Sequence, residues 1–172
     1  MVKYLGICMA AVACVALGFN MSSDIRRRII QLRSLQCALR MLKGEMEYAV
    51  SSLDEAFDRI SDRLEPPFSD FFHTLAYELK ELEFQNFEEI WEKQVRVLTK
   101  TSCLREEDFK LLDELGKQLG YLDLNMQIRT IDSIYIQLEE RLKQLVEESN
   151  ISCKLYQSLG VLGALSVVLI CI

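Results

Sequence analysis

Residues 108–131, DFKLLDELGKQLGYLDLNMQIRTI, decide the expected fold because they read as two amphipathic helices joined by a short turn. Leucines at helical spacing run as far as Leu119, and Gly120 follows as the expected left-handed C-terminal cap. Asp123 then occupies the position of an N-cap, and the apolar residues after it recur at an a/d-type spacing. The stretch therefore predicts a helix over 105–119 and another from residue 124 onward.

Upstream of this stretch, apolar residues at helical spacing predict four further helices. Their expected ranges are about 25–48, a short segment after Ser52, 68–82 and 87–99. Ser52 and Glu55 read as a capping box, and Pro66 and Pro67 are expected to end the short helix. One buried stripe is predicted on the first helix, at Ile29, Leu32, Leu35, Leu39, Leu42 and Met46. We therefore expect an all-α bundle of about six helices.

The two ends of the chain differ from this middle part because they carry no charge. Residues 4–23 and residues 155–172 contain no Lys, Arg, Asp or Glu. A helix crosses the hydrocarbon core of a bilayer with about 20 apolar residues. The sequence predicts an N-terminal transmembrane helix at 1–23, a helical domain at 24–154 and a C-terminal transmembrane helix at 155–172.

Basic residues next to the two apolar segments predict the orientation in the membrane. Arg26, Arg27, Arg28 and Arg33 come after the first segment, and Lys154 precedes the second. Because basic flanks stay on the cytoplasmic side, we expect a cytoplasmic domain and two extracytoplasmic termini. A cleaved signal peptide or a lipoprotein signal are the alternatives, but the arginine cluster opposes translocation of the residues after it.

The sequence lacks the patterns of common catalytic and cofactor sites. It has no phosphate-binding glycine loop, and His73 is the single histidine, so we expect no catalytic residue, cofactor or metal. The middle part carries a net charge of −7, which does not favour nucleic-acid binding. The six scattered cysteines are interpreted as free thiols. The acidic run between Glu78 and Glu92 is interpreted as a solvated helix face.

Several stretches together resemble the stage III sporulation protein AB family of endospore-forming bacteria. They are residues 32–57, LRSLQCALRMLKGEMEYAVSSLDEAF, residues 108–131 and the ending KLYQSLGVLGALSVVLI. The family's structural motif corresponds here to Trp91, Leu115, Gly116, Leu119, Gly120, Asp123 and Gln127. Ser52 stands where the family commonly has proline, which is a local difference at a helix start.

This resemblance implies a role during spore formation, at the mother-cell membrane that surrounds the forespore. It implies a non-enzymatic platform within a channel or secretion-like complex. The cytoplasmic domain would be similar to those of type II secretion F proteins. The implied partners are a cytoplasmic secretion-type ATPase and other stage III channel proteins, with a homo-oligomer left open.

Two other functions stay open from the residues alone. A membrane-anchored receptor or signalling module would need a ligand pocket or a switchable pair of helices. A hydrolase that uses buried carboxylates would need a cleft with paired acids of perturbed pKa.

Overall fold

The computed structural model describes the backbone of residues 2–49, 51–81, 86–120 and 123–171, and the side chains of residues 23–49, 51–81, 86–120 and 123–149. The helices are α1 (Val2–Gly44), α2 (Leu53–Ser61), α3 (Phe68–Glu81), α4 (Phe87–Thr101), α5 (Glu106–Leu119) and α6 (Leu124–Cys171). A π-helical turn, Glu45–Ala49, comes directly after α1. Strands are absent from the described residues, so the prediction of an all-α protein with six helices is confirmed.

The chain divides into two compact units. One is Ile30–Leu142, which we call the helical domain, and the other comprises Met1–Ile29 and Lys143–Ile172. The predicted transmembrane helices at 1–23 and 155–172 fall, except for Ser23, on residues whose side chains lie outside the described part. Within the described residues we find no helix with the length and apolar character that a membrane crossing requires.

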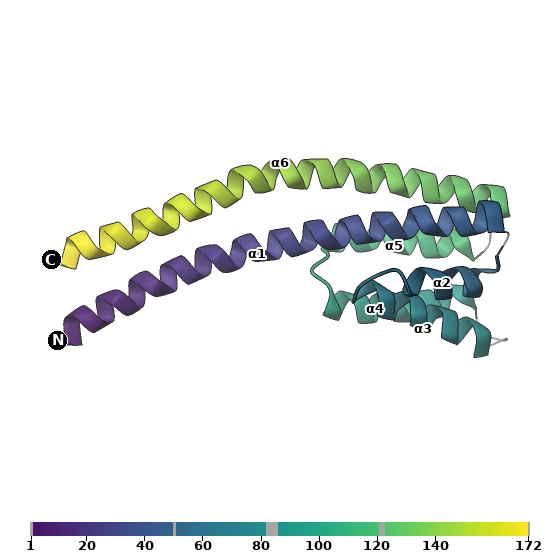
Figure 1. Cartoon of the computed structure of the whole chain (residues 1–172), viewed down its shortest axis with the longest axis horizontal. Helices are drawn as coiled ribbons and strands as arrows, with labels where there is room; N and C mark the ends of the chain where they lie inside the picture. Colours follow the sequence, from purple (N-terminus) through teal and green to yellow (C-terminus); the bar gives the residue numbers. More distant parts are fainter. Residues whose placement is uncertain (1, 50, 82–85, 121–122, 172) are drawn as a thin grey trace. The chain divides into compact units, whose positions relative to one another are not determined.

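Neighbouring helices along the chain pack against one another in the helical domain. α2 contacts α3, α3 contacts α4, and α4 contacts α5 (Figure 1). The parts of α1 and α6 that belong to this domain also lie side by side. Lys43 Nζ on α1 donates to both carboxylate oxygens of Asp132 on α6, at 2.8 and 2.7 Å. These contacts join the first and last helices across 89 residues of sequence.

The predicted stripe on α1 forms one side of the core. Its side chains are at most 9% exposed, and they are Ile29, Leu32, Leu35, Leu39 and Leu42, with Met46 in the π-helical turn. The a/d-type spacing on α6 is borne out in part, since Ile131 and Leu138 are buried together with Ile134. The 3.6-residue period of each helix therefore directs one apolar face inward.

Aromatic side chains from three helices fill the centre of the domain. Phe57 of α2 lies 5.5 Å from Phe72 of α3 and 6.2 Å from Trp91 of α4, measured between ring centroids. Phe71 meets Trp91 edge-on at 5.3 Å, and Phe87 lies 5.8 Å from Trp91. Trp91 thus contacts aromatic rings from α2, α3 and its own helix, which ties these helices together.

Two predictions about helix ends are wrong in detail. Ser52 is the N-cap of α2, but its side chain makes no capping hydrogen bond, so the expected capping box is not formed. α2 ends at Ser61, before the prolines. Pro66 and Pro67 instead precede α3, where the Pro67 carbonyl accepts from Phe71 N at 3.1 Å. Proline suits the start of a helix because the missing amide is not needed there.

Removing the ring of Phe57 tests how much the aromatic centre stabilises the domain. Phe57 is fully buried, and we expect Phe57→Ala to lower the free energy of unfolding by about 3–5 kcal/mol through lost burial and a residual cavity. Urea unfolding followed by Trp91 fluorescence measures the change, since Trp91 is the only tryptophan. Tyr77→Ala is the control, because Tyr77 is 60% exposed and should change the value by under about 0.5 kcal/mol. Equal effects of the two substitutions would contradict a buried aromatic centre.

Candidate functional site

The motif residues lie where α4, α5 and α6 meet, and we call this place the motif junction. It is defined by Trp91, Leu115, Gly116, Leu119, Gly120, Asp123 and Gln127. Leu115 and Leu119 are each 1% exposed and belong to the core. The other members make specific contacts between helices or at helix ends.

Trp91 of α4 lies directly against Gly116 of α5. The indole is 1% exposed, and its Nε1 donates to the carbonyl of Leu112 at 2.9 Å. A Cβ at Gly116 would lie 2.2 Å from Cδ1 of the indole, well inside van der Waals contact. The close approach of the ring therefore requires glycine at this position. Without a Cβ at Gly116, the indole N–H can reach its hydrogen-bond acceptor on α5.

The end of α5 and the start of α6 are held together by side-chain caps. Gln127 Nε2 donates to the Leu119 carbonyl at 2.6 Å, which satisfies an acceptor at the end of α5. Asp123 Oδ1 accepts from Met126 N at 2.8 Å, so the predicted N-cap is confirmed. These two bonds make the turn between the helices a defined corner.

The prediction of a left-handed cap at Gly120 is wrong. Gly120 is the C-cap of α5, but its φ of −74° and ψ of −24° are right-handed helical values. A Cβ at this position would lie 3.1 Å from Cδ1 of Phe87 at the start of α4. Closeness to a neighbouring helix, and not backbone handedness, is thus what makes a small residue suitable here.

The other end of α5 is fixed by Asp108, which sequence reasoning missed as a site residue. Asp108 is fully buried, and its Oδ2 accepts from Arg105 N at 2.9 Å. Arg141 of α6 approaches Asp108 Oδ1 at 3.6 Å and Glu107 at 3.4 Å. A carboxylate at the third position of a helix can be recognised from the local sequence. The arginine lies 34 residues after Glu107, so no local pattern indicates that it lies near this carboxylate.

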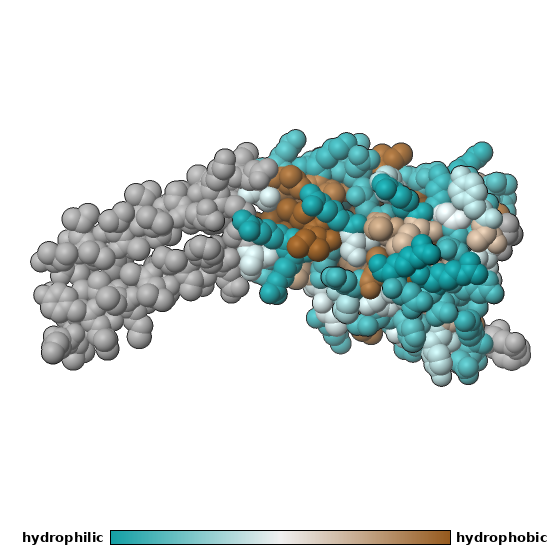
Figure 2. All heavy atoms as spheres, in the orientation of Figure 1, coloured by the Kyte–Doolittle hydropathy of each residue, from teal (hydrophilic) through white to brown (hydrophobic). Residues whose placement is uncertain are grey.

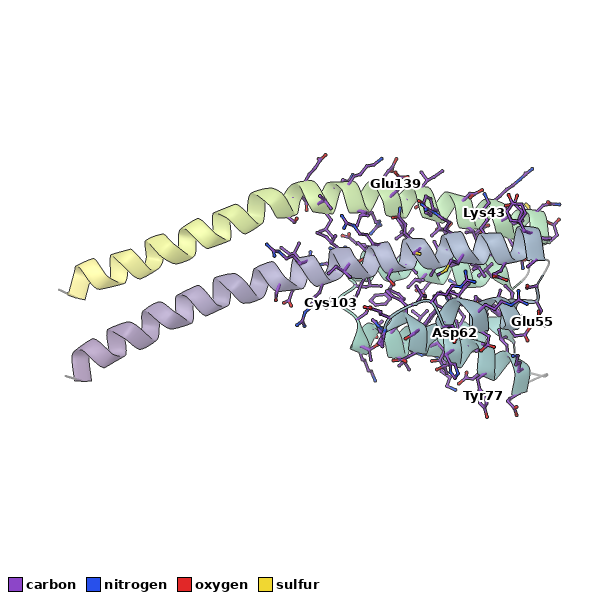
Figure 3. All side chains as sticks on the ribbon, viewed as in Figure 1. Lys43, Glu55, Asp62, Tyr77, Cys103 and Glu139 are labelled. Carbon is purple, nitrogen blue, oxygen red and sulfur yellow. The ribbon has the colours of Figure 1, made fainter. Side chains whose placement is uncertain are left out.

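Polar contacts also join α1 to α6 on the solvent side of the domain. The hydrogen bond to Asp132 raises the pKa of the Lys43 amine. Figure 3 labels Lys43 where the ribbons of α1 and α6 run side by side. The Arg40 guanidinium donates to the Tyr135 hydroxyl and lies 5.4 Å from the centre of that ring. This hydrogen bond raises the pKa of Arg40, so both cations stay charged at neutral pH.

The basic residues predicted to flank the first membrane segment differ in exposure. Arg26, Arg27 and Arg33 are exposed, whereas Arg28 is only 8% exposed. The side chain of Lys154 lies outside the described residues. Arg28 is therefore partly enclosed by the protein, unlike the other three.

The acidic run between Glu78 and Glu92 is not uniformly solvated as predicted. The side chain of Glu78 is only 13% exposed, and its Oε1 accepts from Lys93 at 2.7 Å and Gln94 at 3.1 Å. Glu81 and Glu92 are exposed, as expected for a solvated face. Glu78 instead bridges α3 and α4, a contact that the spacing within one helix does not indicate.

The described residues contain no cluster of three or more His, Cys, Asp or Glu side chains able to hold a metal ion. A groove between α3 and α4 is mainly apolar, with Phe71, Val97 and Leu98 beside Thr74 and Gln94. Its one acidic lining residue is Asp70, which is exposed. The motif junction, by contrast, joins α4, α5 and α6 through buried and part-buried contacts.

The sequence matches the family model of Stage III sporulation protein AB over residues 3–172. The chain belongs to the Stage III sporulation protein AB family. It is 27% identical over 170 residues to Stage III sporulation protein AB of Bacillus subtilis (strain 168), covering 99% of both chains. A solved structure of a Stage III sporulation protein AB aligns with a TM-score of 0.66 at 24% identity, over 72% of this chain and 97% of that one. The Stage III sporulation protein AB membership establishes a role in sporulation, and the structural likeness supports the helical fold.

Gly116→Ala tests the close contact of Trp91 at the motif junction. The added methyl would overlap the indole, so we expect a loss of about 1–3 kcal/mol in the free energy of unfolding, measured by urea denaturation followed by circular dichroism. Gly44→Ala is the matched control, because a Cβ at this helical glycine meets nothing within 4 Å. That variant should be neutral or slightly stabilised, since alanine favours the helix. A neutral Gly116→Ala would show that the indole does not need this space.

Asp113 on α5 provides a pH-dependent test of the same region. Burial raises the pKa of its carboxyl, Lys117 opposes the shift and Glu92 adds to it. The folded state therefore binds the proton more tightly than the unfolded state, and stability falls as the pH rises from the ordinary pKa through the raised one. Asp113→Asn should stabilise the domain at pH 7, and the gain should shrink toward about pH 4, where aspartate is half protonated even when unfolded.

Urea unfolding of Asp113→Asn at several pH values measures this gain. Glu114→Gln is the control, because the neighbouring Glu114 is exposed and its replacement should have little effect at any of these pH values. A gain of the same size at pH 4 and pH 7 would contradict the raised pKa.

Proposed function

We propose that this protein is a non-enzymatic membrane platform of a sporulation channel or secretion-like complex between mother cell and forespore. The observation that carries the proposal is the full-length match to the sporulation family, together with a helical domain tied by buried structural contacts. Such a domain suits docking, because its helices are joined at both ends of α5. In this role the motif junction maintains the shape of the platform and does not carry out a reaction.

Two membrane anchors hold the platform at the mother-cell membrane that surrounds the forespore. The support comes from the sequence, in which residues 4–23 and 155–172 carry no charge and basic residues adjoin both segments. The helical domain then faces the cytoplasm, and both termini lie on the other side. Tethering at both ends limits how far the domain can move from the membrane.

The partner of the helical domain is a cytoplasmic secretion-type ATPase, by analogy with type II secretion F platforms. Charge supports a protein partner of basic character. Residues 53–119, which include α2 to α5, carry 17 acidic and nine basic side chains, for a net charge of −8. A surface with this excess steers a basic protein surface toward it and repels acidic ones.

A pulldown with the full-length chain in detergent tests the partner. The purified ATPase of the sporulation complex should be retained in at least one nucleotide state, and retention should weaken roughly tenfold or more between low and high salt because screening shortens the reach of the charges. Wild-type chain without ATPase and an unrelated acidic membrane protein are the controls. Absence of retention with ATP, with ADP and without nucleotide, alongside a working reference pair, would overturn the coupling role.

A further inference from the structure

Exposed apolar side chains concentrate on α1, on the π-helical turn after it and on α6. Seven large hydrophobic side chains are exposed among the described residues. Five of them are on these elements: Ile30, Tyr48, Leu124, Met126 and Ile136. Figure 2 shows apolar side chains gathered over α1 and α6 on an otherwise mostly hydrophilic surface. A helix pair that leaves so many apolar side chains in water is a candidate for an interface.

The exposed residues of each helix form a stripe with the three- and four-residue spacing of a packing face. We call the two stripes together the α1–α6 face. On α1 the stripe is Ile30, Arg33, Cys37 and Arg40, and on α6 it is Met126, Arg129, Ser133, Ile136 and Glu140, all of them exposed. Two hydrogen-bonded pairs fix the position of α1 relative to α6 along the helix axis. They are Arg40 with Tyr135 and Lys43 with Asp132.

Charge indicates what could cover the α1–α6 face. The stripe on α1 is basic, with Arg33 and Arg40, and the stripe on α6 has Arg129 near its start and Glu140 near its end in the domain. A two-fold interface places the same surface of two molecules together, so that the end of the α1 stripe with Arg33 meets the end of the α6 stripe with Glu140 twice. The side formed by α2 to α5 could not pair with itself in this way, because its net charge of −8 would repel a copy.

We propose that a second copy of this chain docks on the α1–α6 face, with α1 of each copy against α6 of the other around a two-fold axis parallel to these helices. Ile30 and Ile136 then lose contact with water in both copies. The orientation rests on the proposed function, because two chains anchored in one membrane are held the same way up.

This arrangement specifies a charge pair between the copies. Lys43 faces Asp132 and Arg40 faces Tyr135, so the two helices run in opposite directions. A step of three residues back along α1 corresponds to a step of three residues forward along α6. Arg33 comes seven residues before Arg40. Along the helix axis it therefore lies at about the same height as Glu140 on α6. Arg33 of one copy and Glu140 of the second copy lie close together, and the two-fold axis repeats this pair.

Charge reversal in the full-length chain, reconstituted in lipid nanodiscs and in detergent micelles, tests the interface. Mass photometry and light scattering should show a dimer for the wild type. Arg33→Glu and Glu140→Arg should each raise the dissociation constant roughly tenfold, since each places like charges together twice. The double variant Arg33→Glu with Glu140→Arg should restore most of the dimer. Arg96→Glu, at a side chain on α4 that is 72% exposed, is the matched control and should leave the dimer unchanged.

Several results would overturn the interface. They are a wild-type monomer, a dimer that resists both single reversals, or a double variant no better than the single ones. Arg96→Glu weakening the dimer as much as Arg33→Glu would place the contact elsewhere. Labelling of Cys37, which is exposed on the stripe of α1, by an impermeant thiol reagent separates this outcome from failure of the proposed function. A single-cysteine variant protected in intact cells but labelled after lysis supports the proposed anchoring even when no dimer forms.

Discussion

The contact between the Trp91 indole and Gly116 is the constraint on which the rest of the helical domain depends. The missing Cβ lets the ring lie on the backbone of α5, where its N–H reaches the Leu112 carbonyl at 2.9 Å. The same ring contacts Phe57 and Phe71, so α2, α3 and α5 are all positioned against α4 through one side chain. Close packing of a large rigid ring requires a small partner, and glycine is the smallest.

Both ends of α5 are fixed to α6 by polar contacts of side chains. Asp108 faces Arg141 at one end, and Gln127 caps the Leu119 carbonyl at the other. Between them the Thr130 hydroxyl donates to Gln118. A buried carboxylate with both a backbone donor and an arginine nearby is costly to separate from either, so these ties resist local opening.

The helices could be predicted from the sequence because apolar periodicity and the turn residues act over a few positions. Errors arose where a distant residue decided the outcome. Gly120 was predicted to need a left-handed conformation, but Phe87 of another helix is what limits its size. Glu78 was predicted on a solvated face, but Lys93 and Gln94 of the next helix enclose it. Asp108 was missed as a site residue because its arginine partner comes from α6.

Taken alone, the sequence determined the class of fold, the order of the helices and the uncharged ends, since each of these is recorded in local spacing or composition. The family was indicated by the resemblance of whole stretches of sequence to known proteins. Only the tertiary structure explains why these particular amino acids occupy the motif positions. Trp91 and Gly116 are separated by 25 positions, and no periodicity within one helix could relate them. Their contact exists because α4 and α5 pack together, and packing depends on the shapes of side chains that meet only after the chain has folded.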